Sequence, residues 1–153
     1  MLELFSNSAE TTIEIGKKIG TCLKKGDLIA YKGTLAAGKT TLTKGIAQAL
    51  QIDEVITSPT FTLISEYYGR LPLYHFDVYR LDSVEDFLNL GSEEMMYGDG
   101  VCAIEWSEKI ESALPKDTII IEIEILTPET RKITIKNWPH DKNIFSEFTK
   151  WKL

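Results

Sequence analysis

The chain has 153 residues, of which 43% are hydrophobic and 26% charged, as expected for one soluble globular domain. It carries 17 lysines and arginines against 23 aspartates and glutamates, which gives a net charge of −6. An acidic chain is poorly suited to gripping a polyanion over a broad face. If the protein has a role in RNA or DNA metabolism, we therefore expect a partner protein to make the contact with the nucleic acid.

Cysteine content and hydropathy bear on the cellular compartment. Cys22 and Cys102 are too few for a disulfide scaffold and lie in apolar stretches, which predicts free, buried thiols in a reducing environment. The N-terminus lacks a basic region followed by a long apolar run, and no apolar stretch approaches about 18 residues. We therefore expect a cytoplasmic protein with no membrane segment.

The first part of the chain has the pattern strand, helix, strand. Residues 1–7 are compatible with a short edge strand. Residues 8–25 have helical periodicity, with Ser8 as a candidate N-cap and Gly26 at the position of a C-cap glycine. Residues 27–32 are an apolar-rich run, short enough to be a strand that enters the next motif.

A glycine-rich motif follows this strand. Residues 33–40 read G-x-x-x-x-G-K-T, the phosphate-binding P-loop, and residues 41–50 continue as a helix with one apolar face. Glycine permits the tight turn that brings backbone N–H groups to phosphate oxygens at the positive end of a helix dipole. Lys39 is expected to reach the β- and γ-phosphates, and Thr40 to ligate Mg²⁺. The predicted nucleotide contacts in this motif are Gly33, Leu35, Ala36, Ala37, Gly38, Lys39, Thr40 and Thr41.

The middle of the chain predicts a hairpin and a buried strand. After a loop at residues 53–60, residues 61–68 and 71–78 alternate around a turn at Gly69 and Arg70. Residues 83–90 predict a short helix that ends at Gly91. Residues 101–104 are a fully apolar run typical of a buried parallel strand, and a brief loop or helix follows it.

The last part of the chain predicts a second hairpin and a final helix. Residues 118–126 and 131–136 flank a turn at 127–130. From residue 141 the apolar residues have helical spacing, and this face is expected to pack on the core: Ile144, Phe145, Phe148 and Trp151. Together these elements predict one α/β domain over residues 1–153, a P-loop NTPase-like fold whose mixed parallel and antiparallel sheet is flanked by helices on both faces.

A P-loop also needs an acid near the metal and the attacking water. Residues 101–105 have the usual form, four apolar residues that end in an acid, here Glu105. Asp77 ends a second, less apolar strand. Either side chain could instead be an exposed strand-end carboxylate. Beside a P-loop we favour Glu105 as the acid that orients or activates water and contributes to the metal site, with Asp77 as a second catalytic candidate.

Histidine and arginine offer few further candidates. His75 lies alone in a predicted strand, and we interpret it as a core or edge residue rather than a ligand. The arginines are Arg70, Arg80 and Arg131, so any arginine that meets transition-state charge within this chain is one of these. Arg80 follows Asp77 closely and is the favoured candidate, although all three could be surface charges.

Motifs that the sequence lacks help to decide whether the bound nucleotide carries adenine or guanine. No N-K-x-D or D-x-x-G occurs, so the usual guanine-reading and switch motifs of GTPases are missing. The LSGGQ signature of transporter ATPases is missing too. ATP is therefore the expected nucleotide.

Four blocks of this sequence resemble the TsaE family, formerly called YjeE, the small bacterial ATPases of tRNA threonylcarbamoyladenosine synthesis. They are the P-loop at 33–41, S-P-T-F-T-L at 58–63, H-F-D-V-Y-R-L at 75–81 and I-E-W-S-E at 104–108. The blocks occur in the family's order, and the resemblance covers essentially the whole chain. One departure is Ala36, where the family usually has glycine. If that position requires positive φ, alanine costs about 1 kcal/mol and weakens nucleotide affinity.

The resemblance implies roles at matching positions. Lys39 and Thr40 would serve phosphate and Mg²⁺, and Thr41 would bind phosphate. Glu105 resembles the family's acid near the metal and γ-phosphate, and Asp77 resembles its second acid.

Further implied positions lie outside the P-loop and the two acids. Ser58 and Thr60 lie in a block that resembles a switch-type loop able to sense the γ-phosphate. Trp106 follows the acid as in the family, near the nucleotide, although core packing explains a tryptophan equally well. By the same analogy three residues would lie near the adenine: Ala9, Thr12 and Arg131.

The function expected from the resemblance is that of a Mg²⁺-dependent ATPase. It would support addition of a threonylcarbamoyl group to the adenosine beside the anticodon of tRNA. Its partners would be the TsaB and TsaD subunits, through which it would meet tRNA indirectly. Two alternatives stay open: a small-molecule kinase, and a non-catalytic module in which ATP only orders the loop at 58–60.

Overall fold

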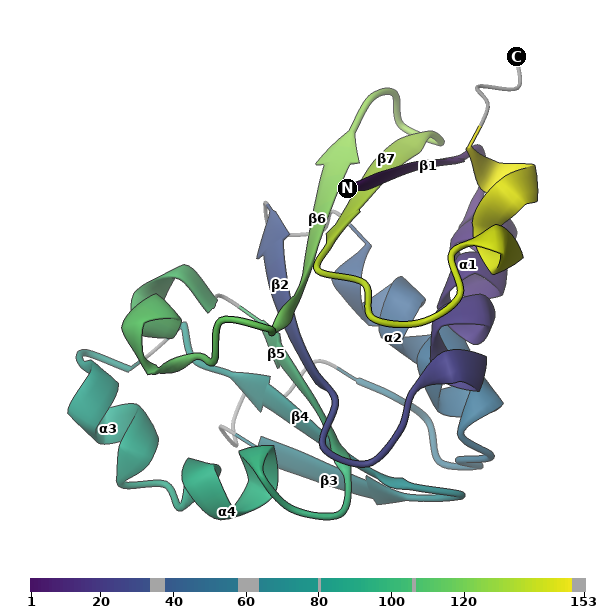
Figure 1. Ribbon diagram of the computed structural model, residues 1–153. Coiled ribbons are helices and arrows are strands. Elements are labelled where there is room, and N and C mark those ends of the chain that lie inside the picture. Colours follow the sequence, from purple (N-terminus) through teal and green to yellow (C-terminus); the bar gives the residue numbers. More distant parts are fainter. Residues whose placement is uncertain (34–37, 58–63, 80, 106, 150–153) are drawn as a thin grey trace.

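One mixed sheet organises the fold, and its strand order is β1-β7-β6-β2-β5-β4-β3. The computed structural model describes residues 1–33, 38–57, 64–79, 81–105 and 107–149. The backbone of these residues forms the sheet that runs through the centre of Figure 1. Its strands are β1 (Leu2–Ser6), β2 (Leu28–Gly33), β3 (Ile64–Tyr68), β4 (Pro72–Asp77), β5 (Val101–Glu105), β6 (Ile119–Ile125) and β7 (Arg131–Lys136).

The centre of the sheet is parallel and its margins are antiparallel. Strand β2 pairs in parallel with both β5 and β6, and β5 pairs in parallel with β4. Two antiparallel hairpins, β3–β4 and β6–β7, extend this centre, and β1 adds an antiparallel edge. The predicted mixed sheet, both hairpins and the buried strand that ends in Glu105 are therefore confirmed.

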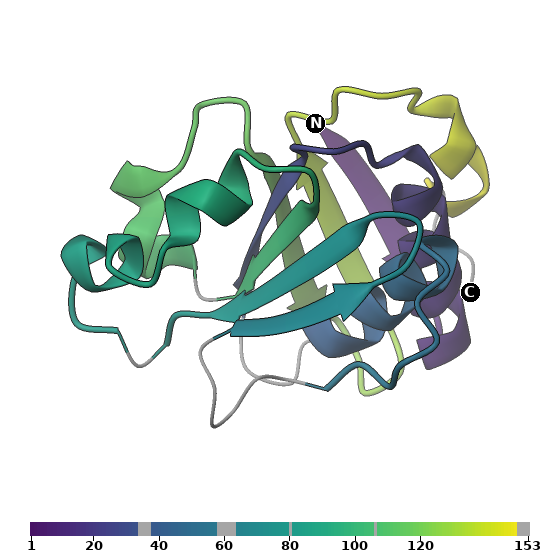
Figure 2. The ribbon, with the colours of Figure 1, turned by 90° about the horizontal axis from the view of Figure 1, so that it is seen from below.

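Helices α1 (Ala9–Cys22) and α2 (Lys39–Ala49) cover one face of the sheet, as Figure 2 shows. They approach each other closely because small residues meet at their contact. A Cβ atom added to Gly45 would lie 2.1 Å from the carbonyl oxygen of Ile13, and one added to Gly16 would lie 2.3 Å from that of Leu42. The apolar face of both helices packs on the sheet in the larger hydrophobic cluster of the core.

Shorter helices cover part of the other face of the sheet. They are α3 (Val84–Leu88), α4 (Ser92–Met96) and the 3-10 segment η1 (Ser107–Ala113). A second hydrophobic cluster fills the space between this layer and strands β2, β4 and β5. The prediction of helices on both faces is confirmed, and α4 is an element that the sequence pattern did not predict.

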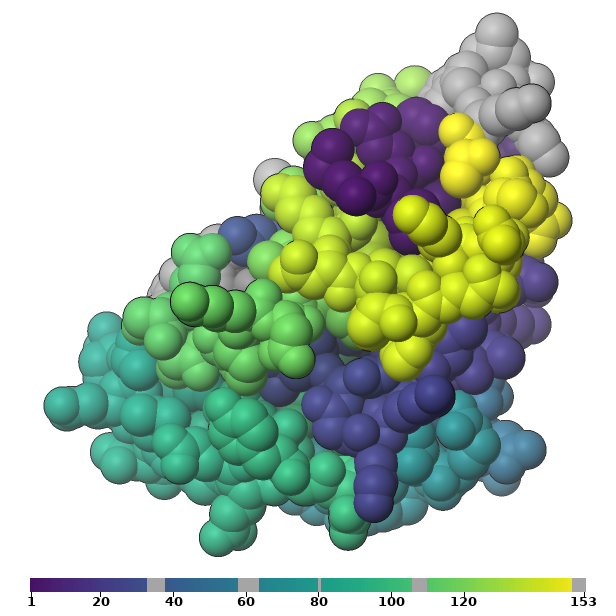
Figure 3. Space-filling view, in the orientation of Figure 1, coloured from purple at the N-terminus to yellow at the C-terminus, as the bar shows by residue number. Residues whose placement is uncertain are grey.

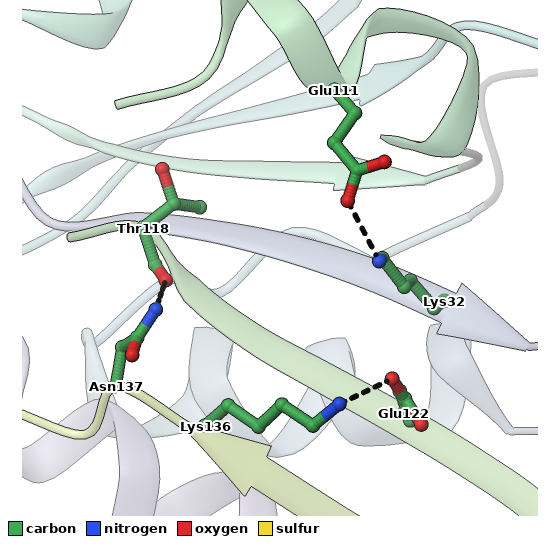
Figure 4. Close-up of polar contacts among 6 residues, drawn as sticks. All are labelled: Lys32, Glu111, Thr118, Glu122, Lys136 and Asn137. Carbon is green, nitrogen blue, oxygen red and sulfur yellow. Dashed lines mark hydrogen bonds and ion pairs between the residues drawn. The ribbon is translucent and has the colours of Figure 1, made fainter. Parts of the chain in front are cut away.

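Polar pairs join β2 to η1, β7 to β6, and the residue after β7 to the residue before β6 (Figure 4). Lys32 Nζ lies 3.0 Å from Glu111, and Lys136 Nζ lies 3.1 Å from Glu122. The Asn137 side chain donates to the Thr118 carbonyl at 3.0 Å. Exposed pairs of this kind contribute little to stability individually.

The C-terminal segment packs beside the N-terminal strand, so purple and yellow residues are neighbours in Figure 3. Its last described element, η2 (Asn143–Phe148), is a 3-10 helix rather than the predicted α-helix, and it buries Phe145 in the core. His140 Nε2 lies 2.8 Å from Asp27, and Trp138 makes an edge contact with Phe145. The first contact joins the loop between β7 and η2 to the start of β2, and the second joins the same loop to η2.

Two local predictions differ from the structure. Helix α1 ends at a C-cap, Leu23, with extended backbone, and Gly26 instead adopts φ +87° in the turn that follows. Cys22 is free but only partly buried, whereas Cys102 is free and buried. In the described ranges no helix is long and apolar enough to cross a membrane.

Candidate functional site

The described part of the P-loop consists of Gly33, which ends β2, and of Gly38 with the first turn of α2. Gly38 caps this helix with φ +114°, a left-handed conformation that favours glycine. A glycine cap brings no side-chain acceptor to the first backbone N–H groups of the helix, which remain suited to an anion. Lys39 starts the helix and is only 6% exposed, while Thr40 and Thr41 are partly exposed beside it. This arrangement fits the phosphate groups of a nucleotide.

A buried hydrogen-bond chain fixes the first turn of α2 to strand β2. The Thr43 hydroxyl donates to the Lys39 carbonyl at 2.7 Å, so its oxygen accepts a hydrogen bond from Tyr31 Oη, 2.8 Å away. Both side chains are fully buried. Burial raises the pKa of Tyr31 well above its ordinary value, and the negative charge of Glu105 raises it further. Tyr31 therefore stays protonated and donates its hydrogen bond to Thr43. Through Thr43 it holds the Lys39 backbone in place relative to the sheet.

The two predicted acids come together at the carboxyl ends of their strands. Asp77 of β4 and Glu105 of β5 are register partners. Their side chains lie on the face of the sheet that α1 and α2 cover. Glu105 is buried at 5% exposure. Asp77 is partly exposed and accepts a hydrogen bond from the Tyr79 N–H at 3.0 Å. Lys39 starts α2, which covers the same face of the sheet, so the three candidate residues lie on one side of it.

The fit of this donor set to Mg²⁺ can be assessed from its chemistry. In the described part of the chain no group of three or more His, Cys, Asp or Glu side chains is arranged to hold a metal ion. Mg²⁺ usually takes one or two protein oxygens and completes its shell with phosphates and water. The Thr40 hydroxyl and one carboxylate, from Glu105 or Asp77, are oxygen donors of the kind that suits an ion arriving with a nucleotide.

A cavity of roughly 340 Å³ opens beside the first turn of α2. The start of α1, the start of α2 and the β6–β7 turn enclose it. Three of the predicted nucleotide contacts outside the P-loop (Ala9, Thr12 and Arg131) lie on its wall together with Gly38 and Thr41. The sequence did not point to the other lining residues, which are Asn7, Ser8, Pro128 and Glu129.

Comparison with known proteins decides the family. The family model "Threonylcarbamoyl adenosine biosynthesis protein TsaE" matches residues 6–133. The chain belongs to the TsaE family. A relative from Treponema pallidum named tRNA threonylcarbamoyladenosine biosynthesis protein TsaE is 50% identical over 130 residues, which cover 85% of this chain and 96% of the relative. The TsaE of Bacillus subtilis is 44% identical over 82% of this chain and 78% of its own length.

A solved TsaE-family fold supports the architecture. The crystal structure of Bacillus subtilis YdiB superposes with a TM-score of 0.73 at 41% identity, covering 88% of this chain and 83% of that one. The P-loop NTPase-like α/β fold predicted from the sequence is confirmed. The resemblance recognised from the four sequence blocks is confirmed as well.

Some predicted TsaE site residues lie outside the described residues. These are Leu35, Ala36, Ala37, Ser58, Thr60, Arg80 and Trp106. Their assignments stay predictions from the sequence. Of the other arginines, Arg70 donates to the Gly20 carbonyl at the C-terminal end of α1, away from the cavity at the N-terminal end. Arg131 donates through Nη1 to the carbonyls of Thr127, Pro128 and Thr130, and so shapes the turn that walls the cavity.

The residues that sequence reasoning missed are supporting ones. Tyr31 and Thr43 carry no motif, and the available signal was only that Tyr31 alternates inward on the strand before the P-loop. The turn at 127–130 was predicted as a turn, but nothing in its sequence says that it reaches the start of α1. Both features depend on tertiary packing.

Proposed function

We propose that this chain is a Mg²⁺-dependent ATPase that supports threonylcarbamoylation of tRNA together with TsaB and TsaD. The observation that carries the proposal is the position of the 340 Å³ cavity, which adjoins the first turn of the P-loop helix. A nucleoside in the cavity would place its phosphates at the N–H groups of that turn. Membership of the TsaE family supports the link to tRNA modification.

Each group of the site has a separate task in this proposal. Lys39 and the backbone of the first turn hold the phosphates and stabilise the charge that develops on them. Thr40 and Glu105 would hold Mg²⁺, which neutralises phosphate charge when bound. Glu105 orients the attacking water, and Asp77 supports the same edge of the site. The chain's own contribution is positioning, since phosphoryl transfer needs little covalent help from the protein.

ATP is preferred over GTP because the motifs that read guanine are missing from the sequence. The cavity wall combines neutral side chains, including Asn7, Ala9 and Thr12, with the charged side chains of Glu129 and Arg131. The neutral part of this wall suits a nucleobase and a ribose.

The test is phosphate release from ATP by the full chain, alone and with TsaB and TsaD. Wild type is expected to hydrolyse ATP in the presence of both partners and Mg²⁺. Lys39→Ala and Glu105→Ala should reduce hydrolysis to background. Matched controls are Lys44→Ala, on an exposed position of the same helix, and Glu124→Ala, on an exposed strand position.

Three results would contradict the proposal. Wild-type hydrolysis by Glu105→Ala would remove the role given to that acid. Phosphate recovered on a metabolite rather than in solution would indicate a kinase. ATP consumption at background with both partners present would indicate a nucleotide-gated binding module.

A further inference from the structure

His75 is a fully buried histidine whose ring nitrogens both lack a hydrogen-bond partner among the described residues. Its exposure is 0%. Buried polar groups are nearly always satisfied, so an exception calls for a physical reason. An apolar side chain would fill the same space on β4 without that penalty. Packing alone therefore does not explain a histidine here.

The position of His75 on the sheet directs it toward Glu105. His75 pairs in register with Ala103, and Asp77, two residues further along β4, pairs with Glu105. Side chains two residues apart on a strand share a face, so His75 and Glu105 project from the same side of adjacent strands. His75 Nε2 lies 3.7 Å from Glu105 Oε2. The carboxylate of Glu105, the acid of the proposed site, therefore lies close to this buried donor.

A separation of 3.7 Å is too long for a hydrogen bond, but a shift of less than about 1 Å would create one. An N–H donor to a carboxylate would be a strong, charge-assisted contact. Hydrogen bonds of catalytic groups are often long before substrate binds and shorten in the complex. The neutral ring suffices, because its Nε2–H tautomer donates one hydrogen bond.

We propose that His75 is a positioning residue for Glu105. Its Nε2–H donates to the Glu105 carboxylate when nucleotide is bound and fixes the orientation in which that carboxylate holds the attacking water. This inference rests on the proposed ATPase function. It assigns no contact with the nucleotide to His75, so it predicts an effect on turnover and little effect on nucleotide affinity.

The test compares three substitutions in the full chain with TsaB and TsaD present. His75→Leu is apolar, while His75→Asn and His75→Gln carry the same amide on side chains that differ by one methylene. The longer glutamine reaches the region of Nε2, and asparagine reaches only that of Nδ1. Leu73→Val is the matched control, since Leu73 is a buried residue on the same face of β4. Circular dichroism, ATP affinity from fluorescence titration and kcat are measured for each.

The expected result is a fall in kcat of about tenfold or more for His75→Leu and His75→Asn, in line with other residues that orient a catalytic group. His75→Gln should recover part of the rate. ATP affinity should stay within about twofold of wild type, and Leu73→Val should keep its kcat. A folded leucine or asparagine variant with wild-type kcat would overturn the role of His75, and so would a loss confined to ATP affinity. A wild-type chain that does not hydrolyse ATP with both partners would instead overturn the proposed function, and the inference with it.

Discussion

Asp77 and Glu105 lie side by side at the carboxyl ends of two adjacent parallel strands, as register partners of β4 and β5. Adjacent strands are about 4.8 Å apart, so the two acidic side chains start from neighbouring positions on one face of the sheet. Like charges in directly opposite positions destabilise a sheet. Their retention at this edge is consistent with a cation that is present during function, which is the Mg²⁺–nucleotide complex in our proposal.

Asp77→Asn should raise the stability of the nucleotide-free protein and lower its ATPase activity. Asparagine can still accept the Tyr79 N–H through its own Oδ1, so the local turn is kept. Loss of one negative charge should raise the free energy of unfolding of the nucleotide-free protein by a few tenths to about 1 kcal/mol. ATP hydrolysis with TsaB and TsaD should fall by about tenfold or more. Urea unfolding and phosphate release measure the two effects, with exposed Asp99→Asn as control.

Lower stability of Asp77→Asn together with unchanged hydrolysis would contradict this prediction. It would show that Asp77 acts only through the turn that it caps.

Tyr31→Phe should loosen the first turn of the P-loop helix. The substitution removes the buried donor to Thr43, while Thr43 still donates to the Lys39 carbonyl. We expect the free energy of unfolding to fall by about 0.5–1.5 kcal/mol and ATP affinity to fall with it. Exposed Tyr97→Phe should change neither quantity. Equal stability of the Tyr31 and Tyr97 variants would mean that the hydrogen-bond chain does not fix α2.

Gly45→Ala should disturb the contact between α1 and α2. The added Cβ would lie 2.1 Å from the Ile13 carbonyl oxygen and 2.9 Å from the Gly16 Cα, and both are backbone atoms. The helices must therefore move apart, at a cost of about 1–3 kcal/mol. Since the two helix starts line one cavity, ATP affinity should fall as well.

The control for this change is Lys44→Ala on an exposed position of the same helix, expected within about 0.5 kcal/mol of wild type. Thermal unfolding and nucleotide titration measure both variants. Full stability of Gly45→Ala would show that the helices can separate without cost.

The two free cysteines should differ in reactivity toward thiol reagents. Burial raises the pKa of Cys102 to about 12, so at pH 8 almost none of this thiol is the reactive thiolate. The pKa of Cys22 is also raised, mainly by burial, but its side chain is partly exposed. A native protein should therefore react at Cys22 only, and denaturant should expose both thiols. Cys22→Ser should leave a native protein that hardly reacts, and comparable rates at both cysteines would contradict the buried position of β5.

Sequence patterns predicted the parts of this protein that depend on local chemistry. The alternation in residues 71–78, the apolar run before Glu105 and the P-loop motif each specify an element together with its functional end. The sequence named Glu105 and Asp77 as separate candidate acids, and the parallel register of β4 and β5 in the structure brings them together.

The remainder depends on tertiary packing that no local pattern encodes. The final segment is apolar at helical spacing, yet its described part forms a 3-10 helix, from which Phe145 packs in the core. His75 was predicted to be a core or edge residue rather than a ligand, and the structure buries it completely. Its closeness to Glu105 became visible only with the register of β4 and β5.

The central claim is that this chain uses a P-loop nucleotide site to support tRNA threonylcarbamoylation. The most direct measurement is the threonylcarbamoyladenosine content of tRNA in bacteria that are depleted of their own TsaE and express this chain. We predict that the wild-type chain restores the modification and that Lys39→Ala, produced at the same level, does not. Failure of the wild-type chain to restore it, or equal restoration by Lys39→Ala, would contradict the account.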